Sequence, residues 1–270
     1  MKLKILSAVI LTALTVSLAG CSASADTDGA ATTGADTSLS SVTDAGVLTV
    51  GTEGTYRPFT FHEGGSGALT GYDVEVIEAV AAELGVKAKF EETQWDGIFA
   101  GLEAGRFDVI ANQVTATPER VEKYDFSTPY TVSTGVIVVK SDNTSITSFE
   151  TLAGKTTAQS LTSNWNTLAT ESGANVQAVE GWAQSVALVE QGRVDATVND
   201  NLTFLDYQKQ TGATGLKVAA NTDEKSESSF AFAKGSTKLT DAVDAALEKL
   251  AAAGTLTSIS EKYFGSDVSQ

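Results

Sequence analysis

The chain has 270 residues, of which 42% are hydrophobic and 19% charged, a balance typical of a packed globular protein. Its formal net charge of −16 disfavours binding to nucleic acid or to an anionic lipid surface. Its only histidine, His62, and its only cysteine, Cys21, exclude disulfides and a zinc site. Since no Gly-rich phosphate loop is present either, we expect no cofactor, no metal and no catalytic residue.

The N-terminus has the pattern of a secretory signal followed by an anchor. Two lysines precede an apolar run from Ile5 to Ala19, which is too short to span a bilayer, and residues 18–21 read LAGC. This pattern resembles a bacterial lipobox, which predicts a signal peptide over residues 1–20 and lipidation of Cys21. We therefore expect an extracytoplasmic protein that is attached to the cell membrane by lipid alone.

The segment after the cysteine is poor in apolar residues. From Ser22 to Asp44, all residues except Leu39 and Val42 are Ser, Thr, Ala, Gly or Asp. Such a composition cannot bury enough apolar surface to order itself. It predicts a flexible tether over residues 21–44 and a folded body that begins near Ala45.

Beyond the tether, short β-like runs alternate with amphipathic helical segments, a pattern that predicts an α/β fold with mainly parallel sheets. We expect helices over residues 73–84 and 238–253, ended by Gly85 and Gly254. The expected strands are residues 47–50, 87–90, 108–112, 136–139, 155–158, 195–199, 216–220 and 230–233.

The chain resembles itself at an offset of 87 residues. Trp95, Gly105, Arg106, Asp108 and Asn112 match Trp182, Gly192, Arg193, Asp195 and Asn199. In both copies the pattern predicts a helix that ends at glycine and a strand that begins at aspartate. We therefore expect two similar lobes, with a polar cleft where their strand ends face each other.

The polar residues near these strand ends suit an amino-acid zwitterion. A guanidinium with hydroxyl and backbone donors holds a carboxylate well, and a carboxylate holds an ammonium. Thr115 and Arg120 lie on either side of Pro118, which can start a helix. Periodicity alone favours a solvent-exposed Arg120, and the residues alone leave acid–base work by paired carboxylates open.

A resemblance to a known family adds to these patterns. The sequence resembles the extracellular solute-binding proteins (family 3) of polar amino-acid ABC importers, and among them the L-cystine-binding branch. The matching segments are VGTEGTYRPFTF (50–61), LTGYDVEV (69–76), WDGIFAGLEAGRFDVIANQVTATPERVEKYDFSTPY (95–130), GRVDATVNDNLTFLDY (192–207) and GTLTSISEKYFG (254–265). Together they extend from about Val47 to Gly265.

The resemblance implies roles for ten residues of the cleft. The ligand carboxylate would be held by Arg120, Thr115, Ser163 and Asn164, the ammonium by Asp200 and Gln113, and the side chain by Tyr56, Phe61 and Trp95, with Glu53 also in the cleft. Two alternatives stay open. Asp200 can instead be the N-cap of the helix that follows it, and one of Phe59 and Phe61 can belong to the core.

The resemblance also implies a type II periplasmic-binding-protein fold, with two lobes joined by two hinge strands. Lobe 1 would comprise residues 45–137 and 231–270, and lobe 2 residues 138–230, with hinge strands at 136–140 and 228–232. A monomer that delivers its ligand to a membrane permease is expected.

Ligand identity and reaction class keep alternatives. Arg57 stands where the family more often has an uncharged residue, and a cation at the cleft mouth would favour a ligand with a distal carboxylate. Cysteine, glutamate, glutamine or another polar amino acid is therefore an alternative to cystine. A cyclohexadienyl dehydratase on the same scaffold, with Glu53 as its acid–base group, is the enzymatic alternative. A receptor-coupled sensor or adhesin would differ only in its partner.

Overall fold

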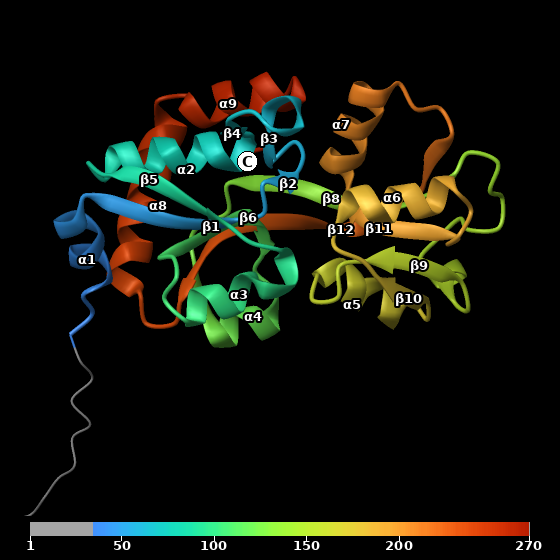
Figure 1. Cartoon of the computed structure of the whole chain (residues 1–270), viewed down its shortest axis with the longest axis horizontal. Helices are drawn as coiled ribbons and strands as arrows, with labels where there is room; N and C mark the ends of the chain where they lie inside the picture. Colours follow the sequence, from blue (N-terminus) through green and yellow to red (C-terminus); the bar gives the residue numbers. More distant parts are fainter. Residues whose placement is uncertain (1–34, 270) are drawn as a thin grey trace, which may run out of the picture. The chain divides into compact units, whose positions relative to one another are not determined.

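The computed structural model describes residues 35–269 (Figure 1). The helices are α1 Ser38–Ala45, α2 Tyr72–Glu83, α3 Trp95–Glu103, α4 Pro118–Lys123, α5 Asn164–Glu171, α6 Trp182–Glu190, α7 Asn201–Thr211, α8 Thr237–Ala252 and α9 Thr255–Phe264, with 3-10 turns η1 Glu63–Gly65 and η2 Glu150–Leu152. The strands are β1 Val47–Thr52, β2 Thr55–Tyr56, β3 Thr60–His62, β4 Leu69–Thr70, β5 Lys87–Glu92, β6 Val109–Thr115, β7 Tyr124–Phe126, β8 Thr131–Lys140, β9 Thr156–Gln159, β10 Asn175–Ala178, β11 Ala196–Asp200 and β12 Leu216–Ala233. The predicted signal peptide and Cys21 lie outside the described residues.

One continuous sheet runs through the body Asp36–Gln270. Its strand order is β10-β9-β11-β8-β12-β6-β1-β5, with β7 also paired to β12. The outer strands pair in parallel on both sides, β1 with β5 and β6, and β9 with β10 and β11. The central strands β8 and β12 pair antiparallel from Leu216 with Lys140 to Ser228 with Thr131. The two strands predicted at 216–220 and 230–233 are thus parts of one long strand.

Two lobes form around the two ends of this sheet, as predicted. Figure 1 shows α1–α4, α8 and α9 around β1, β5 and β6 in the first lobe, and α5–α7 around β9–β11 in the second. In each lobe one apolar cluster lies on either face of the sheet. Because strands buried on both faces need apolar residues, the apolar residues 109–111 of β6 and 136–139 of β8 follow from this layering.

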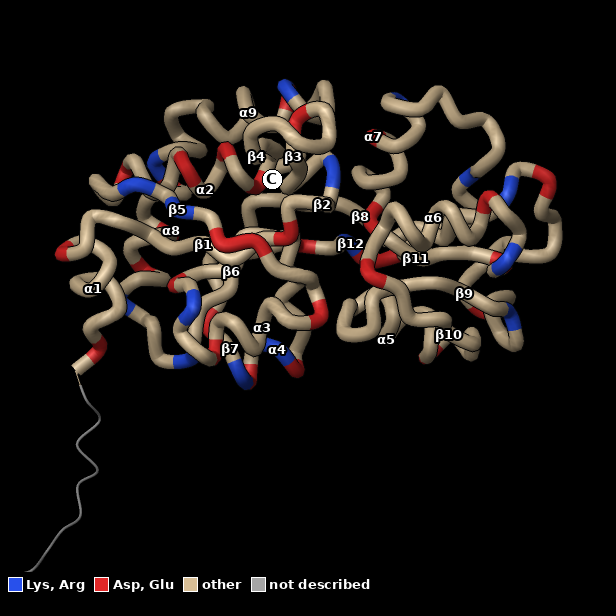
Figure 2. Tube along the Cα trace, in the orientation of Figure 1, with Lys and Arg blue, Asp and Glu red and all other residues tan. Residues whose placement is uncertain are grey.

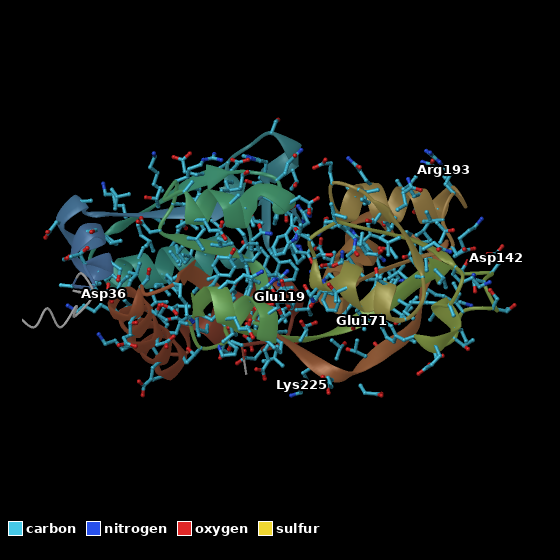
Figure 3. All side chains as sticks on the ribbon, turned by 90° about the horizontal axis from the view of Figure 1, so that it is seen from below. Asp36, Glu119, Asp142, Glu171, Arg193 and Lys225 are labelled. Carbon is cyan, nitrogen blue, oxygen red and sulfur yellow. The ribbon has the colours of Figure 1, made fainter. Side chains whose placement is uncertain are left out.

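The lobes are connected where β8 and β12 pair only with each other. That section comprises residues 132–134 of β8 and 225–227 of β12, and Figure 3 labels Lys225 on it. The hinge strands expected at 136–140 and 228–232 lie inside the lobes instead. The first of these segments pairs with β11, and the second pairs with β6 and β7. Their apolar composition reflects burial in the two cores.

The sequence repeat is confirmed as a repeated helix–turn–strand unit. In each copy a nine-residue helix, α3 or α6, is followed by a left-handed glycine, Gly105 (φ 66°) or Gly192 (φ 68°). The carboxylate Oδ2 of Asp108 accepts from the backbone N–H of Thr49, and that of Asp195 from Thr156, both at 2.8 Å. Each aspartate thereby holds the start of its strand against the neighbouring strand.

The tether predicted over residues 21–44 ends earlier than expected. Residues 38–45 form helix α1, in which Val42 is 2% exposed and Leu39 packs against the core of the first lobe. These are the two residues that depart from the polar composition of the segment. Two apolar side chains on one face of a helix are enough for α1 to dock on α8 and β1.

This docking predicts a measurable contribution of α1 to stability. Val42→Ala removes two buried methyl groups and is expected to lower the free energy of unfolding by about 1–3 kcal/mol. Urea denaturation of the Cys21-free soluble body measures the change, with the exposed Ser41→Ala as the control. Equal midpoints for Val42→Ala and the unmodified body would contradict the docking of α1.

Candidate functional site

A cavity of about 530 Å³ lies between the two lobes. Figure 2 shows acidic segments on both sides of this boundary. Six of the ten predicted site residues line the cavity: Glu53, Tyr56, Trp95, Gln113, Ser163 and Asn164. Phe61, Thr115, Arg120 and Asp200 do not line it. The cavity is therefore built from both lobes, and its lining differs in part from the predicted set.

The two tryptophans of the repeat face this cavity from opposite lobes. Trp95 begins α3 and Trp182 begins α6, so equivalent positions of the two units supply equivalent walls. Trp165 of α5 adds a third indole. Aromatic walls give a large contact area at a small cost in conformational entropy.

Glu53 is held at the end of β1 by the side chain of Asn112. The amide Nδ2 of Asn112 donates to Glu53 Oε2 at 2.6 Å, and its Oδ1 accepts from the Glu53 N–H at 2.8 Å. Burial raises the pKa of Glu53 to about 7, because few groups replace the lost water around its charge. Glu53 thus enters the cavity as an acceptor whose charge depends on pH near neutrality.

Gln113 adopts a left-handed backbone conformation, with φ at 51°, that only glycine adopts without strain. The buried carboxylate of Asp73 fixes it there by accepting from the Gln113 N–H at 2.8 Å and from its Nε2 at 2.6 Å. Thr131 accepts from the same Nε2 at 3.0 Å. Asp73, 0% exposed, therefore positions a residue of the cavity wall without lining it.

Tyr56 connects the lobes across the cavity. Its hydroxyl donates to Asn199 Oδ1 at 2.8 Å and accepts from Thr203 Oγ1 at 3.1 Å, both in the second lobe. Burial raises the pKa of Tyr56 well above its usual value, so the phenol stays neutral and keeps its proton for Asn199.

Arg120 lies beside the cavity, against one of its walls. Its guanidinium is 5.3 Å from the ring centre of Trp95 and 5.2 Å from that of Phe99. One terminal nitrogen donates to the carbonyl oxygen of Thr115 at 3.0 Å, and the other to that of Thr162, in the second lobe, at 3.2 Å. Thr115 thus meets Arg120 through its carbonyl group.

Burial lowers the pKa of Arg120 to about 10, since the guanidinium has lost much of its hydration. Of the ion pairs within residues 35–269, none includes Arg120. The side chain is therefore a half-buried cation with carbonyl partners and no carboxylate partner in this part of the chain.

Asp200 acts as the N-cap of α7, the alternative left open by its sequence context. Its Oδ1 accepts from the Leu202 N–H at 2.8 Å and from Ser133 Oγ, on β8, at 2.8 Å. Asp200 is 4% exposed, and burial raises its pKa to about 6. Its neighbour Asn199 is the residue of this strand end that lines the cavity.

Ser163 and Asn164 bring the N-terminus of α5 to the cavity. Ser163 is the N-cap, and its hydroxyl accepts from the Asn166 N–H at 3.1 Å. The free N–H groups of such a terminus favour an anion.

Three residues of the cavity wall carry buried polar atoms that have no hydrogen-bond partner in the described structure. They are the indole nitrogen of Trp95, Oε1 of Gln113 and Nε2 of Gln159. Buried polar atoms in native proteins are normally paired, so two donors and one acceptor are available to a ligand here. Within residues 35–269 no cluster of His, Cys, Asp and Glu suited to a metal ion is found, and no helix is long and apolar enough to cross a membrane.

Several residues of the site escaped the sequence prediction. Trp182 was found through the repeat but received no role, although its equivalence to Trp95 was a sufficient signal. Asp73 sits at the start of a predicted amphipathic helix, where an acidic residue normally needs no further explanation. For Trp165 and Gln159, nothing in a single sequence distinguishes a residue of a cavity wall from a residue of the core.

The raised pKa of Glu53 predicts a pH-dependent stability. The folded state binds a proton more tightly than the unfolded state, so the contribution of Glu53 to stability falls as pH rises from about 4.5 to about 7. In Glu53→Gln this loss is absent, and the variant gains on the order of 1–3 kcal/mol relative to the original protein over that range. Urea unfolding at pH 4.5 and pH 8 measures it, with exposed Glu63→Gln as control. Parallel pH profiles would refute the assignment.

The contacts of Asp73 predict a structural cost for its removal. Asp73→Ala leaves the Gln113 N–H without an acceptor and its Nε2 with Thr131 alone, and is expected to lower the free energy of unfolding by about 2–3 kcal/mol. Asp73→Asn keeps one acceptor and should lose less. Urea denaturation at pH 7 compares them, with exposed Asp44→Ala as control. An Asp73→Ala protein as stable as the control would show that Gln113 holds its conformation unaided.

Comparison with known proteins agrees with this arrangement. The sequence profile of the bacterial extracellular solute-binding proteins, family 3, matches residues 48–266. The L-cystine-binding protein TcyA of Bacillus subtilis (strain 168) is 49% identical over 267 residues, covering 99% of each chain. The solved L-cystine solute receptor of Neisseria gonorrhoeae, in an unliganded open conformation, is 48% identical, covers 86% of this chain and 98% of its own, and superposes with a TM-score of 0.59.

A second solved structure has the same fold at lower sequence identity. It is an ancestral amino-acid-binding protein described as a precursor of cyclohexadienyl dehydratase, 35% identical, with a TM-score of 0.77 and coverage of 84% of this chain and 99% of its own. The family profile, the full-length relative and the shared two-lobe fold agree with one another. The chain belongs to the bacterial extracellular solute-binding proteins, family 3.

Proposed function

We propose that this protein captures L-cystine, or a closely related polar amino acid, in the cavity between its lobes and delivers it to the permease of an ABC importer. The relative that matches the chain over its full length is named as an L-cystine-binding protein. The observation that carries the proposal is the half-buried guanidinium of Arg120, which lies against the cavity wall.

A cation that has lost hydration and has no carboxylate partner in the described range is suited to an incoming carboxylate. The fork of the guanidinium binds a carboxylate in two parallel hydrogen bonds, which ammonium groups cannot do. Arg120 uses one bond from each terminal nitrogen for a carbonyl oxygen, which leaves further donors. The N-terminus of α5, at Ser163 and Asn164, adds N–H donors to the same anion.

The ammonium group of the ligand meets a carboxylate. Asp200 does not line the cavity and uses its Oδ1 to cap α7 and to accept from Ser133, so the ammonium is assigned to Glu53. Glu53 lines the cavity directly, and with Gln113 it offers acceptors. Because burial raises the pKa of Glu53 to about 7, a bound ammonium would restore its charged form.

The same lining argues against an acidic ligand such as glutamate. The lining residues include the carboxylates Glu53, Glu92 and Glu180 but neither lysine nor arginine. A second ligand carboxylate would be repelled here, whereas cystine brings a second ammonium with its second carboxylate. Arg57, which the sequence analysis considered as a partner for such a carboxylate, is paired with Asp206 instead.

An enzymatic role on the same fold has one observation in its favour. Glu53, with a pKa of about 7, is suited to acid–base work, and one structural relative is described as a precursor of cyclohexadienyl dehydratase. Against it stands the full-length relative, which is a binding protein. We therefore propose binding without catalysis, and incubation with prephenate or arogenate tests this, since any turnover would contradict it.

Attachment and assembly form part of the same proposal. The LAGC sequence supports lipidation of Cys21 and anchoring at the outer face of the cell membrane, and the protein acts as a monomer. Labelling with a radioactive fatty acid, with and without Cys21→Ser, and sedimentation of the soluble body test these two points.

Isothermal titration calorimetry against cystine and the twenty amino acids tests the binding function. We expect cystine to bind at roughly micromolar affinity and Arg120→Ala to weaken it by at least about 100-fold, because the ligand carboxylate loses its cation in a buried site. Arg106→Ala, an exposed arginine of the same lobe, is the matched control. Unchanged affinity in Arg120→Ala would refute the carboxylate assignment, and no binding of any amino acid would refute the function.

A further inference from the structure

Arg57 and Asp206 form an ion pair that joins the two lobes outside the cavity. Arg57 Nε donates to Asp206 Oδ2 at 3.3 Å, from the turn after β2 in the first lobe to α7 in the second. The Asp206 side chain is 8% exposed and that of Arg57 41%. Neither residue lines the 530 Å³ cavity.

The guanidinium is held in place by its own lobe. It lies 3.8 Å from the ring centre of Phe61, on β3, which explains why this aromatic residue is not a cavity wall as predicted. Asp206 has one other side-chain partner, Gln210 Nε2 at 3.2 Å, on its own helix. Each member of the pair is therefore supported within its lobe, and only the bond between them crosses.

We propose that the Arg57–Asp206 pair is a closing contact: it sets ligand affinity by stabilising the lobes in contact, without touching the ligand. The proposal rests on the proposed function, since it concerns the affinity of that same cavity. When the lobes separate, Asp206 regains water; when they meet, its carboxylate is buried and needs the guanidinium. The stacking of Arg57 on Phe61 lowers the entropy lost on pairing.

Two solved relatives superpose on this structure to different extents. The receptor described as open is 48% identical yet superposes at a TM-score of 0.59, whereas the ancestral protein, at 35% identity, superposes at 0.77. The overlap of the backbones thus does not follow sequence identity. A contact that exists in one arrangement of two lobes alone changes the balance between arrangements.

Removing each charge of the pair alone, and both together, gives three variants with different expected affinities. Arg57→Gln leaves Asp206 to be buried without a cation, and should weaken cystine binding roughly ten-fold with a faster release rate. Asp206→Asn leaves a half-exposed cation on Phe61 and should weaken binding by roughly three-fold. The double variant buries no lone charge and should recover most of the affinity lost in Arg57→Gln.

The experiment is calorimetry for affinity and stopped-flow tryptophan fluorescence for release, on the soluble body at low and high salt. Arg193→Gln is the matched control, because it removes the same charge from a side chain that Figure 3 shows at the surface of the second lobe, away from the first. The melting temperature of each ligand-free variant checks folding. High salt is expected to reduce the difference between the original protein and Arg57→Gln.

Two results would overturn the proposal while the proposed function stands: Arg57→Gln binds and releases cystine like the original protein, or the double variant is as weak as Arg57→Gln. The second result would give Arg57 a purely structural role. Failure of the original protein to bind any amino acid would overturn the proposed function and this proposal with it.

Discussion

In the described residues the backbone crosses between the lobes through two paired strands, β8 and β12, and the rest of the structure depends on this pairing. Between residues 132–134 and 225–227, β8 and β12 have no other strand beside them, so the sheet is two strands wide there and wider on both sides. A ribbon of this width can twist, whereas the lobes, each with apolar clusters on both faces of its part of the sheet, cannot deform cheaply. Contacts such as Tyr56 with Asn199 add to this two-strand connection between the lobes.

The electrostatics of the cavity region follow from having more buried carboxylates than cations. Glu53, Asp73 and Asp200 all have pKa values raised by burial, and hydrogen bonds from amide, hydroxyl and backbone groups compensate only in part. Arg120 shows the opposite imbalance, a cation with carbonyl partners. A zwitterion bound in the cavity would bring an ammonium to Glu53 and a carboxylate to Arg120, and so would offset part of the cost of burying these two groups.

The sequence was sufficient to predict the fold class and most helices and strands. The alternation of strand and helix patterns and the helical periodicity can be read from short segments, and the repeat at 87 residues from a comparison of the chain with itself. The repeat was confirmed down to the paired roles of Asp108 and Asp195. Contacts between residues that are far apart in the chain could not be predicted from the sequence. Nothing in the residues themselves shows that Phe61 lies under Arg57, and for Asp200 the sequence left the helix N-cap and the ligand site as alternatives. Helix α1 was missed because composition averages over a segment, whereas docking requires only Leu39 and Val42.

The order of the chain has a consequence for how the molecule is assembled. The second lobe is one uninterrupted stretch between β8 and the start of β12, while the first lobe needs the end of β12 and helices α8 and α9, the last elements made. In a chain that emerges from its N-terminus, the second lobe can complete its core first. The apolar face of α2 packs with Leu247 and Leu250 of α8, so the core of the first lobe is complete only when segments on both sides of the second lobe are present.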